Sequence, residues 1–212
     1  MPILDDSVKR YIRGLQPERS EIMAEMEAVA ERDDVPIVHW ETGRFLAVLC
    51  RTLDPVVLEV GTAIGYSTLH MAEQLRQGRV ITLELREDRA RQARDFFERA
   101  GVSDRVELIE GDARATIEAV NGPIDLLFVD ATKAEYRGYI ELAEPKLSAR
   151  AVLVVDNMLM SGEVALPGGE NGQWDTESLT AARELNAELL DSDRWLACVL
   201  PIGDGIAFAT RR

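Results

Sequence analysis

The chain has 212 residues, of which 46% are hydrophobic and 29% are charged. This length suits one well-cored domain, so we expect residues 1–212 to form a single unit whose first 34 residues are a helical extension. The formal net charge of −14 argues against a general affinity for nucleic acid, because phosphates must be neutralised by lysine and arginine. The sequence has neither a membrane-span pattern nor a signal-peptide pattern, and we therefore expect a cytoplasmic protein.

Three segments with helical periodicity precede the first expected strand, over 5–14, 17–32 and 41–51. Pro17 suits the first turn of the second helix, where its missing N–H is not needed. These helices are expected to pack against a sheet or against a second copy of the chain, which favours a homodimer. A role in covering a substrate remains open.

The segment LEVGTAIGYS, residues 58–67, follows an apolar run and contains two glycines four residues apart. It predicts a buried strand over 55–60, a helix over 67–74 and a turn that brings backbone close to a ligand. Gly61 and Gly65 lack the G-x-G-x-x-G spacing of dinucleotide sites, and Glu59 would repel a diphosphate. A cofactor with an amine and a sulfonium fits better, which favours S-adenosylmethionine. A tight turn without a ligand is the alternative.

Strand and helix patterns alternate from residue 55 onward, which predicts a mostly parallel sheet with helices on both faces. Glu84 ends the second strand, where an acid in nucleoside-binding folds accepts hydrogen bonds from ribose hydroxyls. Asp112 follows the third strand and can either meet the adenine edge or cap the next helix. The remaining expected elements are strands over 79–84, 106–109, 124–129 and 151–155, helices over 89–100, from about 113 and over 179–190, and an antiparallel hairpin over 195–200 and 205–210.

Polar side chains end two further strands of the expected sheet. Asp130 follows one strand, and Asp156 and Asn157 follow the next. Open α/β sheets bind ligands at the carboxyl edge of their strands, so these three side chains are expected to converge. Two carboxylates and a carboxamide, without cysteine or histidine, make a hard oxygen site that suits Mg²⁺. Helix capping by each acid is the alternative, and it explains the converging trio poorly.

The histidines and cysteines show no ligand spacing. We therefore interpret His39 and His70 as structural residues, and Cys50 and Cys198 as buried thiols. The glycine-rich segment 161–176 lies beside the expected metal edge and predicts a loop that acts as a lid or a substrate wall.

With these residues in place, the chain resembles the cation-dependent O-methyltransferases, the group of catechol and caffeoyl-coenzyme A methyltransferases with their small bacterial relatives. The resemblance covers about residues 35–212 and rests on four motifs, LEVGTAIGYS, FVDATK, VDN and LPIGDG. It implies an α/β, Rossmann-like class I methyltransferase fold, with a seven-stranded, mostly parallel sheet that ends in an antiparallel hairpin.

The resemblance also implies a set of site residues. Mg²⁺ or another hard divalent cation would be held by Asp130, Asp156 and Asn157, and Lys133 together with Asp130 would be catalytic. Thr132 stands where many relatives have Asp, which leaves the metal trio intact. Met160 stands where many have Trp near the substrate, which leaves the substrate open. S-adenosylmethionine would contact Val38, Glu59, Gly61, Ser67, Glu84 and Ala113. Thr62, Gly65, Asp112 and Asp130 lie on the same loops and are further predicted cofactor contacts.

Together these residues predict an S-adenosylmethionine-dependent and metal-dependent O-methyltransferase that acts on a small, catechol-like hydroxylated aromatic substrate. Lys133 would take the hydroxyl proton, provided that desolvation and the metal lower its pKa. A salt bridge from Lys133 to Asp130 or Glu135 is the alternative.

Two other functions stay open. A non-catalytic, dimeric binding module would keep the fold without the chemistry. Methylation of a hydroxylated uridine in transfer RNA would need a phosphate-binding rim of basic residues beside the metal edge. The candidates for that rim are Arg86, Arg89, Arg91 and Arg94, or Lys9, Arg10 and Arg13.

Overall fold

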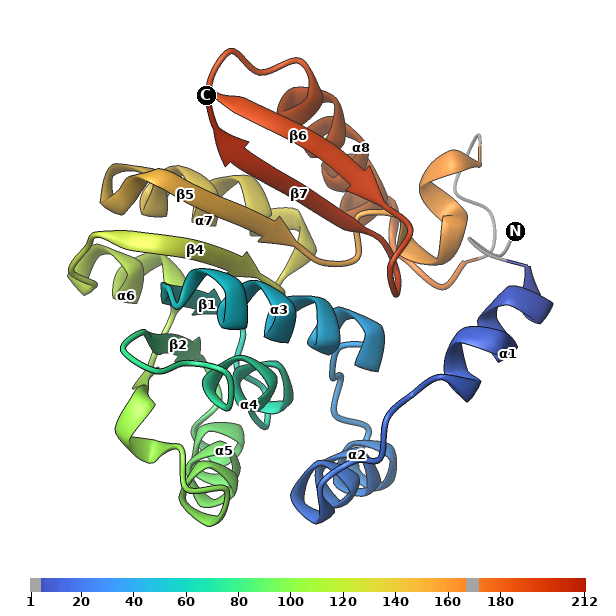
Figure 1. The fold of residues 1–212 in the computed structure, drawn as a ribbon. Helices are drawn as coiled ribbons and strands as arrows, with labels where there is room; N and C mark the ends of the chain where they lie inside the picture. Colours follow the sequence, from blue (N-terminus) through green and yellow to red (C-terminus); the bar gives the residue numbers. More distant parts are fainter. Residues whose placement is uncertain (1–4, 167–171) are drawn as a thin grey trace.

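The computed structural model describes residues 5–166 and 172–212. Its centre is a seven-stranded sheet with the order β3-β2-β1-β4-β5-β7-β6 (Figure 1). The pairs among β1 to β5 are parallel, and β7 pairs antiparallel with both β5 and β6. This is the class I fold with an antiparallel C-terminal hairpin that the sequence predicted.

The strands lie close to the predicted segments, with one clear difference. β5 begins at Leu147 rather than at residue 151, because Ser148, Ala149 and Arg150 are at least partly exposed and interrupt the apolar run of a buried strand. The strands are β1 (Val56–Val60), β2 (Arg79–Glu84), β3 (Val106–Glu110), β4 (Ile124–Val129), β5 (Leu147–Val155), β6 (Trp195–Leu200) and β7 (Ile206–Arg211).

Eight α-helices are present in the described residues, and two of them differ from expectation. The second begins at Glu21 because the Ser20 hydroxyl accepts the N–H of Met23 and caps it, so Pro17 lies before the helix and not in its first turn. Helix α7 was not predicted. The helices are α1 (Asp6–Gly14), α2 (Glu21–Asp33), α3 (Trp40–Leu53), α4 (Tyr66–Ala72), α5 (Glu87–Arg99), α6 (Ala113–Ala119), α7 (Tyr136–Ala143) and α8 (Thr176–Leu190).

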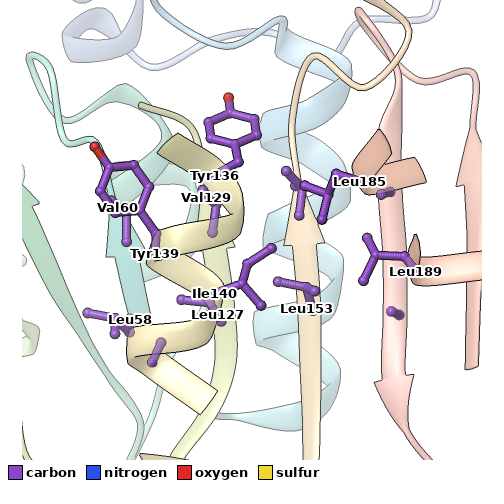
Figure 2. Packing of buried hydrophobic residues seen from close by; sticks show 14 of the residues in the cluster. Leu58, Val60, Leu127, Val129, Tyr136, Tyr139, Ile140, Leu153, Leu185 and Leu189 are labelled. Carbon is purple, nitrogen blue, oxygen red and sulfur yellow. The ribbon is translucent and has the colours of Figure 1, made fainter. Parts of the chain in front are cut away.

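Two hydrophobic layers cover the two faces of the sheet, because neighbouring strand residues point to opposite faces. Leu58 and Leu127 face α6, α7 and α8, and Figure 2 shows Ile140 of α7 and Leu185 of α8 packed in this layer. The alternate residues, such as Val57, face α2, α3, α4 and α5. Burial on both faces explains the continuous apolar runs in the central strands.

The two cysteines have different surroundings. Cys50 of α3 is fully buried, as predicted. Cys198 is exposed, so the prediction of a buried thiol is wrong for it. β6 is the edge strand of the sheet, where Trp195 packs into the α8 layer while Leu196 and Cys198 face the other way.

The architecture places a ligand edge at the centre of the sheet. β1 and β4 are neighbours although they are far apart in the chain, so the strand order reverses between them. Crevices at such a reversal, beyond the carboxyl ends of the strands, bind ligands in open α/β sheets. None of the described helices is long and apolar enough to cross a membrane.

Candidate active site

The glycine-rich loop between β1 and α4 lies unusually close to its neighbours. Gly61 has φ +104° and Gly65 has φ +88°, conformations that strain any other residue. A Cβ atom on Gly61 would lie 2.0 Å from the carbonyl oxygen of Asp130, and one on Gly65 would lie 2.4 Å from the ring of Phe97. Both positions therefore require glycine if the loop is to keep its place between β4 and α5.

Glu59 lies beneath this loop and is fully buried. Its carboxylate accepts hydrogen bonds from the hydroxyls of Ser67 at 2.5 Å and Thr82 at 2.6 Å, and from Thr68. Burial raises the pKa of Glu59 to about 7, while the three hydroxyls act in the opposite direction. The Glu59 carboxylate thus connects β1 to the start of α4 and to β2 through these hydrogen bonds.

A cavity of about 370 Å³, which we call the first cavity, opens above the carboxyl ends of β1, β2 and β4. Its volume lies within the range of small-molecule sites. Glu59 and Gly65 lie behind its wall. Leu85, Arg114 and Tyr139 also line it and were not predicted from the sequence. The predicted residues that line it are Val38, Gly61, Thr62, Ser67, Glu84, Asp112, Ala113, Asp130 and Lys133.

Two acids at the strand ends hold the cavity wall in shape. Glu84 accepts the backbone N–H of Ala63 at 2.7 Å and that of Arg86 at 2.9 Å. Each carboxylate oxygen has further acceptor capacity, so Glu84 is free to receive ligand hydroxyls. Asp112 caps α6 through the N–H of Arg114 at 2.9 Å, and the same residue lines the cavity. Its two predicted roles are therefore compatible.

Lys133 forms an ion pair with Asp130 across the cavity floor. Its Nζ lies 2.6 Å from Oδ1 of Asp130, and both side chains are largely buried. The hydroxyl of Tyr136 lies 3.5 Å from the same oxygen. Of the two salt-bridge partners considered for Lys133, the structure shows Asp130 and not Glu135. The amine is thus held at the edge where the predicted metal ligands converge.

Asp156 brings a second carboxylate to this edge. Its backbone N–H donates to Val129 at 3.1 Å, and that of Asp130 donates to Val60 at 2.9 Å, so both acids are locked to neighbouring strands. Asp156 is buried, and its Oδ1 has no hydrogen-bond partner among the described residues. Burial and the nearby charge of Asp130 raise the pKa of the Asp156 carboxyl.

A hard cation fits these residues. A buried carboxylate with an unpartnered oxygen, next to a second carboxylate, is costly unless positive charge offsets it. Asn157 follows directly with φ +60°, a conformation that asparagine tolerates. Within the described ranges, no three His, Cys, Asp or Glu residues form a metal-binding group, and the predicted trio contains only two carboxylates beside its carboxamide. The predicted donor set remains Asp130, Asp156 and the amide oxygen of Asn157.

The LPIGDG turn between β6 and β7 fixes the loop that follows Asn157. The carbonyl of Asp204 accepts the N–H groups of Leu159 at 2.9 Å and Met160 at 3.0 Å. Gly205 has φ +92°, and a Cβ there would lie 2.6 Å from the backbone nitrogen of Leu159. This motif thus supports the loop whose first residue is a predicted metal ligand. The predicted lid segment 161–176 lies partly outside the described residues.

The two histidines differ. His70 is buried, and burial lowers its pKa to about 4, which agrees with a structural residue. His39 has a side chain that is 51% exposed, and its Nε2 lies 3.6 Å from Asp204. The acceptor carboxylate of Asp204 stabilises the protonated imidazole and raises the pKa of His39. His39 therefore faces solvent beside the site rather than filling the core.

The first set of rim candidates, Arg86 with the arginines of α5, is largely neutralised, because three of its four members pair with nearby acids, which weighs against a transfer RNA substrate at this set. The pairs are Arg86 with Asp88, Arg91 with Glu87, and Arg94 with Glu110. The second set, Lys9, Arg10 and Arg13, forms no ion pair within the described residues, so it leaves the transfer RNA alternative open.

Comparison with known proteins agrees with this site. A family model described as O-methyltransferase matches residues 15–212. The chain belongs to the O-methyltransferase family. It is therefore a class I, S-adenosylmethionine-dependent O-methyltransferase, as the sequence predicted, and the non-catalytic alternative falls away.

Three relatives of this O-methyltransferase illustrate the match. A catechol O-methyltransferase from Mycobacterium tuberculosis is 38% identical over 68% of this chain, and the match covers 65% of that protein, just under two thirds of its length. A catechol O-methyltransferase from Niastella koreensis is 34% identical over 87% of this chain and 85% of its own. The O-methyltransferase from Bacillus cereus, solved in complex with SAH, is 28% identical with a TM-score of 0.84 and 97% coverage of both chains.

Proposed function

We propose that this O-methyltransferase transfers the methyl group of S-adenosylmethionine to one oxygen of a vicinal diol on an aromatic ring, with Mg²⁺ or another hard divalent cation. The observation that carries the proposal is the buried, unpartnered Oδ1 of Asp156 beside Asp130. The catechol O-methyltransferase names of two relatives support the same substrate class.

The first cavity provides the cofactor site. Glu84 would accept hydrogen bonds from the ribose hydroxyls, because it ends β2 and faces the cavity with acceptor capacity to spare. The loop at Gly61 allows the close backbone approach that the methionine part needs. The relative from Bacillus cereus, solved with SAH, supports the choice of cofactor.

Asp130, Asp156 and Asn157 would hold the cation, which when bound orients two adjacent substrate oxygens and lowers the pKa of the attacking hydroxyl. Lys133 Nζ would take the proton from that hydroxyl. The hydroxyl oxygen forms a bond to the methyl carbon, the carbon–sulfur bond breaks, and its electron pair stays on sulfur as the sulfonium becomes a thioether. This in-line displacement depends mainly on positioning, which the strand-end residues supply.

The test is methylation of catechol before and after chelation. We expect EDTA to abolish turnover and Mg²⁺ to restore it in the parent protein. Asp156→Ala should lose Mg²⁺-dependent turnover while keeping SAH affinity, because it removes a ligand of the cation and leaves the first cavity intact. Asp193→Ala is the matched control, because Asp193 is an exposed acid outside the predicted metal trio, and this variant should behave as the parent. Turnover that EDTA leaves unchanged would contradict the metal role.

We also infer that the chain forms a homodimer. Val8 and Tyr11 of α1 and Leu15, which directly follows it, are exposed, with exposed fractions of 43%, 69% and 61%. Apolar faces of this kind mark interaction surfaces. Light scattering of the parent should give twice the chain mass, and Tyr11→Glu should shift it toward one chain mass. A parent that is monomeric at all concentrations would refute this inference.

A further inference from the structure

A second cavity, of about 490 Å³, lies between α1, α3 and the turn that joins β6 to β7. Ile12 of α1, Phe45 and Val48 of α3, and Ile202 of the turn give it an apolar wall. Its volume, like that of the first cavity, lies within the range of small-molecule sites.

Helix α1 borders this cavity without filling it. Lys9 and Ile12 lie on the side of α1 that lines the cavity, yet no residue of α1 is buried. Figure 1 shows α1 at the side of the molecule, apart from the helices that cover the sheet. An apolar wall that faces open space gains stability when a planar, apolar ligand covers it.

The charges around the cavity are mainly positive. Lys9, Arg13 and Arg44 line it, and none of the three forms an ion pair with another described residue. Two acids also line it, Glu41 and Asp204. Three cations against two acids around an apolar wall, in a chain with a net charge of −14, make a locally positive site that attracts an anion.

The acid of the turn is already engaged. Asp204 receives the Ser161 hydroxyl at 3.3 Å and lies 3.6 Å from Nε2 of His39. Its negative charge is therefore partly balanced by Ser161, His39 and Lys9. Arg13 and Arg44 then remain as the cations of the wall, with Glu41 as the other acid that lines it.

The second cavity lies next to the predicted reaction centre. Val38 lines the first cavity and His39, the next residue, lines the second. Ser161, four residues after Asn157, also lines the second cavity. Asp156 is among the charges that raise the pKa of His39, so the metal edge and this cavity are electrostatic neighbours.

We propose that the second cavity binds the methyl acceptor, and that the acceptor is an aromatic diol bearing an anionic group, which Arg44, Arg13 and Lys9 receive while the apolar wall takes the ring. This inference rests on the proposed function and adds to it the charge of the substrate. A carboxylate and a phosphorus oxyanion share the required chemistry, because both accept paired hydrogen bonds from arginine.

The test compares three diols with S-adenosylmethionine and Mg²⁺. They are 3,4-dihydroxybenzoate, its uncharged methyl ester and 3,4-dihydroxyphenylphosphonate. The parent should use the anionic diols with kcat/KM at least about tenfold above the ester, mainly through KM, because a charge-assisted pair is made only with the anions. The ratio between the benzoate and the phosphonate identifies the preferred anion.

Substitution of Arg44 assigns the preference to this cavity. Arg44→Met keeps the apolar stem and should reduce the benzoate-to-ester ratio of kcat/KM about tenfold. Arg44→Lys should recover part of the ratio, which separates a charge effect from a folding defect. Arg51→Met, on the same helix but outside the cavity, is the matched control and should keep the parent ratio.

The outcomes separate this inference from the proposed function. Equal kcat/KM for the benzoate and the ester in the parent, or an unchanged ratio in Arg44→Met, would overturn the anion site while leaving catechol methylation intact. Failure to methylate any diol would overturn the proposed function instead. In that case calorimetry with 3,4-dihydroxybenzoate still tests the anion site of the second cavity. Equal affinity of the parent and Arg44→Met for the benzoate would overturn the site, and a lower affinity of the variant would support it.

Discussion

Replacement of Gly61 by alanine tests the geometry of the site most sharply among single substitutions. A Cβ at this position would lie 2.0 Å from the carbonyl oxygen and 2.8 Å from the carbonyl carbon of Asp130. Both atoms belong to backbone, so neither can rotate away as a flexible side chain would. Either the loop after β1 or the end of β4 must move.

The expected cost has two parts. Residue 61 has φ +104°, where a residue other than glycine pays about 1–3 kcal/mol of backbone strain. Overpacking against fixed neighbours adds about 1–3 kcal/mol. The free energy of unfolding should therefore fall by about 2–6 kcal/mol, which for a domain of this size lowers Tm by roughly 4–24 °C. Because Asp130 lines the first cavity, SAH affinity should fall as well.

Thermal melting with and without SAH is the assay, and Gly138→Ala is the matched control. Gly138 lies in α7, where its φ is not positive and an added Cβ would meet no atom within 4 Å. Alanine there should stabilise the helix by roughly 0.5–1 kcal/mol. A Gly61→Ala protein with the parent Tm and the parent SAH affinity would refute the close packing of the two loops.

Three further predictions follow from single residues. Lys133→Met should lower the single-turnover rate about 10²- to 10⁴-fold with little change in SAH affinity, and a pH–rate profile that overlays the parent's would eliminate Lys133 as the base. Burial, and to a smaller extent the charge of Arg44, lower the pKa of His70 from 6.5 to about 4. As pH falls from 7 to 4, the unfolded chain therefore binds a proton at this histidine that the folded chain does not bind. Stability should therefore drop by up to about 3 kcal/mol over this window in urea melts, and His70→Gln should flatten the drop. A thiol reagent should modify Cys198 quickly in the folded protein and Cys50 only on unfolding, and two fast thiols would contradict the burial of Cys50.

The fold was predictable because each central strand is a short apolar run bounded by glycine or an acid. Helix α7 was missed although Tyr136, Tyr139, Ile140 and Ala143 carry a helical stripe, and all four are buried. The polar start of β5 gave no pattern that a sequence can distinguish from a loop.

The sequence predicts which residues lie at the ends of strands, but it does not predict the direction in which their side chains point. Asp130 and Asp156 follow from the rule that ligands bind at the carboxyl edge of a parallel sheet. Glu59 was expected to face the cofactor, but it accepts hydroxyls from Thr68 and Thr82, which lie on two other elements. The second cavity was not predictable, because α1, α3 and the turn at Asp204 meet only in the folded chain.

The central claim is that Asp130, Asp156 and Asn157 form one site for a hard divalent cation. Titration of Mn²⁺ into metal-free protein, followed by electron paramagnetic resonance of the free ion, measures that site without any substrate. We expect a single bound ion per chain in the parent and an affinity at least about tenfold lower in Asp156→Ala, with SAH affinity unchanged. Equal Mn²⁺ affinity in the two proteins would contradict it.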